Sequence, residues 1–465
     1  MFGPATNVRR RSGRRPVTSI AHWPPGYSDS PNKRPQSIDR TSSSRPGLPS
    51  RSTRNRNRGI AAEELRRHNL AAVVEQLHLR GPISRSDLVS STGLNRSTIA
   101  DLIGELSRLG LAEEGPAVTP SGPGRPSPMV HARPQGAVVL AIEISVDYLG
   151  VATVGLGGHV YQQVREPKPR GRFTPRETMD DLTRMTGPML AALPADATLA
   201  GVGAAVAAII RRSDGFVHLA PNLGWRNVPL GAILAAELGL SDPVLVANEA
   251  DLGALAEFRR GVGAGVSHLV YVSGEVGIGT GIIHDGKPML GAAGYAGEAG
   301  HTLINPGGLP CSCGAAGCWE TEAGEAALAR HAGIPSTIAG SGLLETVLVR
   351  ANAGDELALG AIAEIGRWLG LGIGNLINVF NPELVVLGGF YHPLYPYLEE
   401  SVHQGARFEA LDAPGDIVEI TRSALGSNAL LTGAAELAFS EVIADPAGRG
   451  ARSLGTRPAE GESGA

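Results

Sequence analysis

The sequence predicts a two-lobed α/β protein preceded by a small winged helix-turn-helix domain. Three observations lead to this prediction. Short stretches with helical periodicity occupy residues 65–109, and from residue 135 onward strand-like apolar runs alternate with helical patterns in two successive blocks. Glycine is also abundant, at 63 of 465 residues, which suits many tight turns between strands and helices.

The composition excludes several classes of protein. Hydrophobic residues make up 42% and charged residues 18%, which is typical of a globular chain and not of a charged disordered polymer. The first 30 residues contain Arg but no apolar core segment, unlike a secretory signal. No uncharged apolar run approaches the roughly 18 residues that span a bilayer, since the best candidate, 198–210, is too short. We therefore expect a cytoplasmic protein.

Charge is distributed unevenly along the chain. Residues 1–60 hold twelve Arg and Lys33 against Asp29 and Asp39, whereas the remaining residues carry 28 basic and 43 acidic side chains. The first sixty residues are also rich in Ser, Pro, Asn and Gly. We expect a disordered basic arm that adds non-specific affinity for phosphates, although a solvated tail or a start codon assigned too early would give the same composition. Residues 444–465 are expected to form a disordered tail.

Order is expected to begin near Glu63, in a DNA-binding domain that spans residues 62–133. Apolar residues follow helical spacing until Gly81-Pro82 ends a first helix: Leu65, Leu70, Val73, Val74 and Leu77. Ser84 is placed to cap a short second helix that Gly93 ends, and Asn95 to cap a third. The inward face of the third helix should consist of Ile99, Leu102, Ile103, Leu106 and Leu109. A segment rich in Pro and Gly then follows, as a wing would.

This order matches a winged helix-turn-helix, although a small three-helix bundle has a similar periodicity. The candidate DNA contacts are Asn95, Arg96, Ser97 and Thr98 at the start of the third helix, and Arg125 in the wing. The first four have the reach for phosphates and base edges, and Arg125 is placed to enter a narrow minor groove. Asp101 and Glu105 on the same helix oppose binding, so base contacts are expected only from the helix tip and the wing.

The pattern from residue 136 to residue 443 predicts two lobes, divided near residue 248, with a ligand cleft between them. The first lobe should contain an antiparallel meander, then a helix, two strands and a helix: 137–145, 148–156, 159–164, 175–193, 198–210, 244–247 and 249–260. The second restarts with strands 268–273 and 278–284, a hairpin expected to close at Asp285-Gly286. It continues through a strand at 384–387 to a final helix near 428–442.

All three cysteines fall within eight residues, in Cys311-Ser-Cys313-Gly-Ala-Ala-Gly-Cys318, and His301 lies ten residues earlier. Gly314 and Gly317 allow the chain to turn, so that three thiolates and one imidazole can converge on one ion. Cys3His is a closed tetrahedral set for structural zinc. Buried or redox-active thiols are the alternative, but they leave the clustering unexplained.

The same residues carry a resemblance. Gly297-Glu298-Ala-Gly300-His301, followed by Cys311-x-Cys313-Gly-x-x-Gly317-Cys318-Trp-Glu320, resembles the signature of the ROK family of sugar kinases and sugar-responsive repressors. The similarity covers about residues 62–443. It implies an actin-like, ribonuclease-H-like pair of lobes. Members with an N-terminal winged helix resemble the xylose and N-acetylglucosamine repressors, whereas members without one are usually kinases.

The resemblance also implies a sugar site, made of Asn248, Glu249, Glu298, His301 and Glu320. Carboxylate and amide groups around a pyranose accept hydrogen bonds from its hydroxyls. His301 is able to offer one ring nitrogen to a hydroxyl while the other binds zinc. Taken singly, each carboxylate would more often be a surface charge or a helix cap.

Phosphoryl transfer is not expected, because the resemblance fails at the phosphate loops. The first loop of the kinases, Asp-x-Gly-Gly-Thr, reads Glu143-Ile-Ser-Val146-Asp147 here, and the second, Gly-Thr-Gly-Ile-Gly, reads Glu275-Val276-Gly277-Ile278-Gly279. Carboxylates therefore replace groups that would meet ATP phosphates. Glu249 stands at the position of the catalytic Asp, which accepts the sugar hydroxyl proton in the kinases.

The sequence thus predicts a DNA-binding transcriptional regulator of carbohydrate genes, most simply a repressor. Its expected partners are a double-stranded operator and a sugar or sugar derivative, and its expected assembly is a homodimer or a higher homo-oligomer. The alternatives are an ATP-dependent ROK sugar kinase that carries a DNA-binding domain, and a constitutive DNA-binding protein with a vestigial sugar fold.

Overall fold

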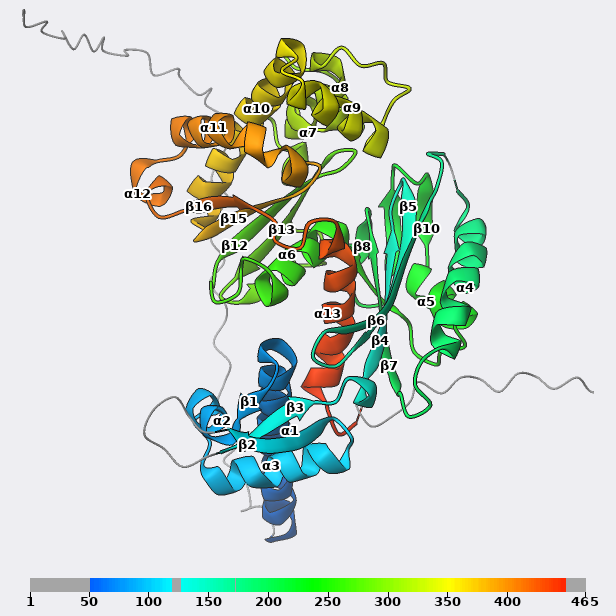
Figure 1. The fold of residues 1–465 in the computed structure, drawn as a ribbon, viewed down its shortest axis with the longest axis vertical. Helices are drawn as coiled ribbons and strands as arrows, with labels where there is room; N and C mark the ends of the chain where they lie inside the picture. The colour runs from blue at the N-terminus through cyan, green and yellow to red at the C-terminus, as the bar shows by residue number, and fades with distance from the viewer. Residues whose placement is uncertain (1–50, 119–126, 172, 449–465) are drawn as a thin grey trace, which may run out of the picture. The chain divides into compact units, whose positions relative to one another are not determined.

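The computed structural model describes residues 51–118, 127–171 and 173–448 (Figure 1). The wing residue Arg125, residues 1–50 of the predicted arm and residues 449–465 of the predicted tail lie outside the described residues. The predicted arm extended to residue 60, but helix α1 (Arg51–Arg80) already begins at Arg51. Once a helix exists, each added residue gains a backbone hydrogen bond, and Arg is a good helix former, so the helix extends beyond its apolar stretch.

The N-terminal domain contains three helices and a small antiparallel sheet. After α1 come β1 (Ile83–Ser84), α2 (Arg85–Thr92), α3 (Arg96–Arg108), β2 (Ala112–Val118) and β3 (Ser127–Ala132), with β3 paired between β1 and β2. The predicted caps are confirmed: the Ser84 side chain accepts from the Asp87 amide, and Asn95 accepts from the Thr98 amide. Gly93 ends α2 in the left-handed conformation, with φ of 70°. The order of elements is that of the predicted winged helix-turn-helix.

The core of this domain contains most of the predicted apolar residues. Leu70, Val73, Val74 and Leu77 of α1 are buried, together with Ile99, Leu102, Ile103 and Leu106 of α3. Leu109 is partly buried at the end of α3. Leu65 is exposed, contrary to the prediction, because it precedes the part of α1 against which the other elements pack.

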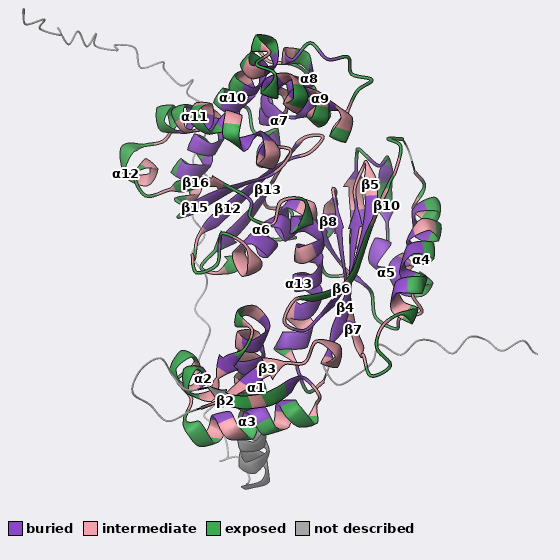
Figure 2. Ribbon diagram, viewed as in Figure 1, coloured by how far each residue is buried: buried purple, intermediate pink, exposed green. Residues whose placement is uncertain are grey.

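Each lobe is built on a five-stranded mixed sheet (Figures 1 and 2). The first sheet contains the antiparallel meander β4 (Val138–Ile144), β5 (Tyr148–Gly155) and β6 (His159–Pro167). Strand β7 (Leu199–Val206) pairs in parallel with β4, and β11 (Leu245–Asn248) pairs in parallel with β7. A smaller antiparallel sheet contains β8 (Ile209–Arg211), β9 (Phe216–Ala220) and β10 (Trp225–Val228). The run 198–210 is therefore two strands in two sheets, not one. Helices α4 (Pro175–Ala191) and α5 (Leu230–Glu237) belong to this lobe.

The second sheet repeats the topology of the first. Strands β12 (Leu269–Gly274), β13 (Ile278–His284) and β14 (Lys287–Pro288) form the meander. Strand β15 (Leu384–Gly389) pairs in parallel with β12, and β16 (Glu419–Arg422) pairs in parallel with β15. The hairpin between β12 and β13 turns at residues 275–277, so the predicted closure at Asp285-Gly286 was wrong. That pair has φ of 49° and 70°, as a tight hairpin turn requires, but it joins β13 to β14.

Helices of the second lobe surround its sheet and fill its core. They are α7 (Trp319–Ala323), α8 (Glu325–His331), α9 (Gly340–Asn352), α10 (Glu356–Phe380), α11 (Tyr391–Glu409) and α12 (Asp412–Gly415). By length and composition, α10 is the one helix among the described residues that is apolar enough to cross a membrane. However, 56% of its apolar window is buried, and Ile362, Leu369 and Ile373 lie in the core of the lobe, as in the core helix of a globular domain.

Two helices lie between the two sheets: α6 (Glu249–Arg260) and α13 (Ala429–Ala444) (Figure 1). Helix α13 packs on β4 and β7 of the first sheet, and α6 packs on α13 and on β12 and β13 of the second. The chain therefore does not divide simply near residue 248, because its last helix returns to the first lobe. A Cβ at Gly433 would lie 2.1 Å from the Leu252 carbonyl oxygen, so the close contact of α13 with α6 requires glycine there.

Candidate functional site

The predicted metal ligands lie together. One ligand atom from each of His301, Cys311, Cys313 and Cys318 lies within 4.8 Å of the others. The Cys313 and Cys318 sulfurs are 3.7 Å apart, and the Cys311 sulfur is 3.5 Å from His301 Nδ1. His301 ends a short 3-10 helix, η2 (Ala299–His301), and Cys318 directly precedes α7.

Two glycines shape the loop that carries the cysteines, as the sequence predicted. Gly314 and Gly317 have φ of 94° and 73°, and a Cβ at Gly317 would lie 1.8 Å from the Asn305 carbonyl oxygen. The Cys311 amide donates to the Ala315 carbonyl at 2.8 Å, which closes the turn between the ligands.

Two of the separations between these ligand atoms fit a tetrahedral zinc ion. With bonds of about 2.3 Å to sulfur and about 2.0–2.1 Å to nitrogen, tetrahedral angles place two sulfurs about 3.8 Å apart and a sulfur and a nitrogen about 3.5 Å apart. The measured 3.7 Å and 3.5 Å agree with both values. These four residues therefore have the donor types and the spacing that a structural zinc ion needs.

The predicted sugar residues divide into three neighbouring groups. Asn248 and Glu298 line a small cavity of about 30 Å³ with Ala208, Thr280 and Tyr295. His301 and Glu320 lie beside the cysteine loop, with His301 Nδ1 3.6 Å from Glu320 Oε1. The third group is Glu249 alone, at the first position of α6, where burial and the Glu143 carboxylate raise its pKa to about 7.

Asn248 holds the start of α6 in place. Its side-chain oxygen accepts from the Ala250 amide at 2.8 Å, and its amide donates to the Ala208 carbonyl at 3.1 Å. Because Ala208 also lines the small cavity, the N-terminus of α6 is attached to the wall of that cavity. Asn248 therefore links this cavity to the start of the helix between the lobes.

A second, larger cavity of about 620 Å³ is lined by one residue from each of the two altered phosphate loops. Asp147 and Glu275, far apart in the sequence, both line it, together with Glu325, Arg165 and Arg170. Burial raises the pKa of Glu275, and the carboxylates of Glu249, Glu143, Asp147 and Glu325 raise it further. The sequence-based expectation that carboxylates gather around this cavity is met by its geometry.

Two arginines of this cavity were missed from the sequence. Arg170 donates to Asp147 at 2.8 Å and to Glu325 at 2.7 Å, and Arg165 donates to Glu143 at 3.1 Å. Asp147 belongs to the first lobe and Glu325 to the second, so Arg170 links the lobes across the cavity. No local pattern marks either arginine, because their partners lie 22 to 155 residues away.

The predicted DNA-contacting residues lie at the start of α3. Arg96 and Ser97 are exposed there and Thr98 is half-buried. Asn95 is also exposed, but its side-chain oxygen is occupied by Ser97 Oγ at 2.7 Å and by the Thr98 amide at 2.9 Å. Glu105, which opposes DNA binding by its charge, forms an ion pair with Arg66 of α1. Arg125 lies outside the described residues.

A family model described as "ROK family" matches residues 139–441. The chain belongs to the ROK family. It is also 31% identical over 386 residues to the xylose repressor of Caldicellulosiruptor bescii, an alignment that covers 78% of this chain and 93% of the relative.

Two solved ROK structures resemble the fold to different extents. A ROK family transcriptional regulator, described as a homolog of the E. coli MLC protein, has 27% identity and a TM-score of 0.68, and covers 82% of this chain and 97% of its own. A ROK family glucokinase from Streptomyces griseus, in complex with glucose and AMPPNP, has 26% identity and a TM-score of 0.57, and covers 65% of this chain and 99% of its own. The regulator therefore matches a larger part of this ROK protein than the kinase does.

Proposed function

We propose that this ROK protein is a transcriptional repressor of carbohydrate genes, and that a sugar or sugar derivative controls its affinity for DNA. The observation that carries the proposal is the union, in one chain, of a ROK domain with an N-terminal domain whose third helix exposes Arg96 at its tip. The greater coverage by the regulator structure and the similarity to a xylose repressor support it.

DNA is proposed to contact the tip of α3 and the wing. Arg96, Ser97 and Thr98 supply cationic and hydroxyl groups at a helix N-terminus, which suits phosphates and major-groove base edges. Asn95 then acts mainly as the cap that orients them, and Arg125 enters the minor groove from the wing. A homodimer would present two such helices to a two-fold symmetric operator.

The sugar is proposed to bind beside the small cavity, among Asn248, Glu249, Glu298, His301 and Glu320. The carboxylates accept hydrogen bonds from sugar hydroxyls, and Asn248 offers an amide donor and an acceptor. These residues come from both lobes, since Asn248 and Glu249 start α6 whereas Glu298 and Glu320 belong to the second lobe. A bound sugar would therefore favour one relative position of the lobes.

Zinc is proposed to be held by His301, Cys311, Cys313 and Cys318 and to have a structural role. A closed four-ligand set leaves no open position for a substrate, so the ion would supply local folding energy and no reaction chemistry. It would fix His301 and the loop before Glu320, and thereby orient two of the proposed sugar contacts.

Loss of kinase activity is the second part of the proposal. The larger cavity is lined by Asp147, Glu275 and Glu325, and the carboxylates of Glu143 and Glu249 act on Glu275 from behind that lining. The two arginines in the cavity are already paired with Glu143, Asp147 and Glu325. A nucleoside triphosphate would meet negatively charged side chains where its phosphates need cations. The alternative is an active sugar kinase with a DNA-binding domain, which the glucokinase similarity favours.

The test is fluorescence anisotropy of a labelled duplex, selected by the protein from a random library, at fixed salt with and without D-xylose or D-glucose. We expect sub-micromolar binding that at least one of the sugars weakens when no nucleotide is present. A coupled ADP-release assay with the same sugars tests the alternative. Absence of selective DNA binding, or phosphorylation at ordinary sugar-kinase rates, would refute the proposal.

A further inference from the structure

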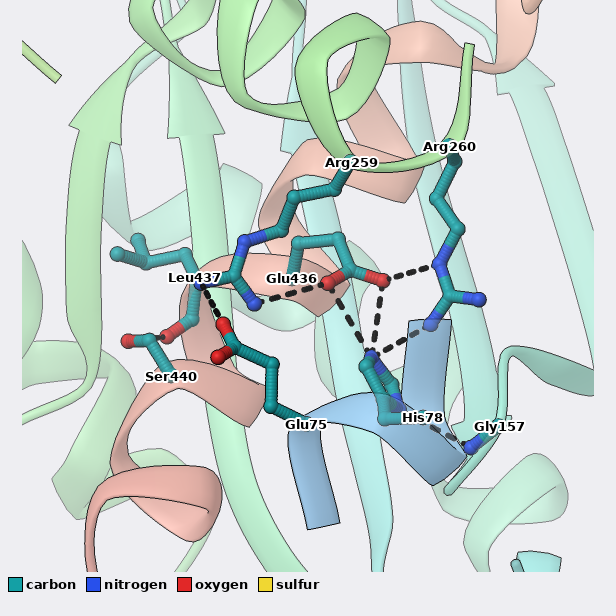
Figure 3. A network of polar contacts seen from close by, with 8 residues as sticks. All are labelled: Glu75, His78, Gly157, Arg259, Arg260, Glu436, Leu437 and Ser440. Atoms are coloured by element: carbon teal, nitrogen blue, oxygen red, sulfur yellow. Dashed lines mark hydrogen bonds and ion pairs between the residues drawn. The ribbon is translucent and has the colours of Figure 1, made fainter. Parts of the chain in front are cut away.

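We infer that a buried polar cluster at the far end of α6 (His78, Arg260 and Glu436, with Arg259 and Glu75 beside them) transmits sugar binding to the DNA-binding domain. Figure 3 shows its side chains pointing toward one another: His78 and Glu75 from α1, Arg259 and Arg260 from the end of α6, and Glu436 from α13. This inference rests on the proposed function and adds a set of positioning residues to it.

The cluster joins the DNA-binding domain to the ROK domain. His78 is fully buried on α1, and its Nε2 lies 3.1 Å and 3.2 Å from the two carboxylate oxygens of Glu436. Its Nδ1 accepts from the Gly157 amide, in the turn between β5 and β6, at 3.0 Å. Arg260 Nε donates to Glu436 at 2.7 Å, and Arg259 lies 3.8 Å from Glu75 and 3.5 Å from Glu436. Three helices thus meet at the Glu436 carboxylate, and the turn between β5 and β6 joins them through His78.

Helix α6 connects this cluster to the proposed sugar site. Asn248 and Glu249 stand at its first turn, and Arg259 and Arg260 are in its last turn. The helix is twelve residues long, which is about 18 Å. The backbone of α6 packs closely against its neighbours on two sides. The Leu252 carbonyl lies against Gly433 of α13, and the Ala250 carbonyl lies against Gly281 of β13, where a Cβ added to Gly281 would lie 2.2 Å from the Ala250 oxygen. A displacement at the sugar end therefore moves the arginine end as well.

The contacts at His78 cannot all be satisfied at once. A neutral imidazole has one donor and one acceptor. The Gly157 amide occupies Nδ1 as a donor, which assigns the ring proton to Nε2 and suits Glu436 as the acceptor. Arg260 Nη2 lies 2.6 Å from the same Nε2, so two donors face each other there. Nε2 can accept from Arg260 only in the other tautomer, which gives up the Glu436 contact and also the Gly157 contact at Nδ1. We infer that the cluster can alternate between these two arrangements.

The charges in the cluster make the choice between the two arrangements of His78 sensitive to the position of α6. Burial lowers the pKa of His78 more than Glu436 raises it, so the ring is neutral near pH 7. The Glu436 carboxylate then faces two arginines and one neutral ring, inside the protein, where such interactions are strong. A small shift of α6 that moves Arg260 relative to Glu436 changes which partner His78 keeps, and with it the position of α1. Such a two-state element is what coupling between distant sites requires.

The test compares Arg260→Gln, His78→Gln and the matched control Arg350→Gln. Arg350 of α9 bonds Asp355 and the Ala332 carbonyl, each at 2.8 Å, so the control likewise removes an arginine that is paired with one carboxylate, at a site away from the cluster. The quantity measured is the ratio of duplex dissociation constants with and without saturating D-xylose or D-glucose. Circular dichroism and the binding of each ligand alone show that a variant is folded.

For the wild type and Arg350→Gln we expect a ratio of at least about fivefold, as in ordinary allosteric proteins. For Arg260→Gln and His78→Gln we expect less than about twofold, although each variant still binds DNA alone and sugar alone. A folded variant of either residue with the full ratio overturns the inference, and so does one that loses binding of either ligand alone. A wild type that responds to neither sugar instead refutes the proposed function, which distinguishes the two failures.

Discussion

The Cys313 and Cys318 sulfurs lie 3.7 Å apart, which matches the edge expected of a zinc-thiolate tetrahedron and is far too long for a disulfide bond. The fourth corner, His301, comes from a different loop, and the next residue of the signature, Glu320, contacts both His301 and Cys311. The proposed metal site and the proposed sugar site therefore share one side chain, so loss of the ion should disturb both.

Purified protein is expected to contain one zinc ion per chain by elemental analysis. Cys318→Ser should lose the ion and lower the melting temperature, because structural zinc supplies roughly 10–16 kcal/mol in small peptides. It should also weaken sugar binding, because His301 and the loop before Glu320 lose their anchor. Ser312→Ala, in the same loop but outside the ligand set, is the control and should retain zinc. Zinc-free wild type with normal stability would contradict this prediction.

Arg96→Ala is expected to weaken operator binding by about 5- to 150-fold, the range of one good base or phosphate contact of about 1–3 kcal/mol. The fold should not change, because the side chain is exposed. Arg176→Ala, which removes an exposed arginine from α4 of the ROK domain, is the matched control. Arg125→Ala should relax the preference for A·T-rich minor-groove positions. Gel-shift titration at fixed salt measures the operator affinity of all three variants. Wild-type affinity of Arg96→Ala would refute the docking model.

Glu436 is expected to make stability depend on pH. Burial would raise its pKa, but His78, Arg260 and Arg259 together lower it to about 2. A carboxylate with a lowered pKa stabilises the fold above its unfolded value and loses that contribution as pH falls toward the folded value. Glu436→Gln should therefore cost about 3 kcal/mol near pH 7 and only about 1 kcal/mol near pH 3. Urea unfolding at both pH values measures the difference. Glu400→Gln, at an exposed position, is the control and should change the free energy of unfolding at neither pH. An equal cost at both pH values would show that the ion pairs do not stabilise the fold.

Much of the fold and part of the site could be predicted because their signals are local. Ser84 and Asn95 cap the helices that follow them by accepting from amides three residues on, and the four predicted metal ligands fall within eighteen residues. The error at Asp285-Gly286 has a local cause as well. The turn type was right, but the strand that follows is only two residues long and has no pattern of its own.

What the sequence did not reveal depends on distant partners. His78 and Glu436 are 358 residues apart, and Arg170 meets Glu325 across 155 residues. Each of these residues is of a polar or charged type that is usually found at the protein surface. Only the repeat of the sheet topology, and the return of α13 to the first lobe, brings them together.

ATP is expected neither to bind measurably nor to be turned over, whichever sugar is present. Asp147 and Glu275 line the cavity in which the two phosphate loops meet, and unit charges about 4 Å apart repel by about 4 kcal/mol at an effective dielectric of 20. The Asp147 carboxylate alone would cancel about half of the roughly 8 kcal/mol of a micromolar ligand, and the raised pKa of Glu275 shows that negative charge is already disfavoured at the second loop. Arg165 and Arg170 do not restore that energy, because a phosphate would first have to displace Glu143, Asp147 and Glu325 from them.

Isothermal calorimetry with Mg-ATP should show no heat, whereas the cognate sugar should bind without nucleotide. Asp147→Asn combined with Glu275→Gln should raise nucleotide affinity above that of the wild type, and Asp180→Asn with Glu400→Gln, two exposed carboxylates outside the cavity lining, is the control. Wild-type protein that binds Mg-ATP at micromolar concentration, or a double variant that binds it no better, would show that charge in this cavity does not exclude the nucleotide.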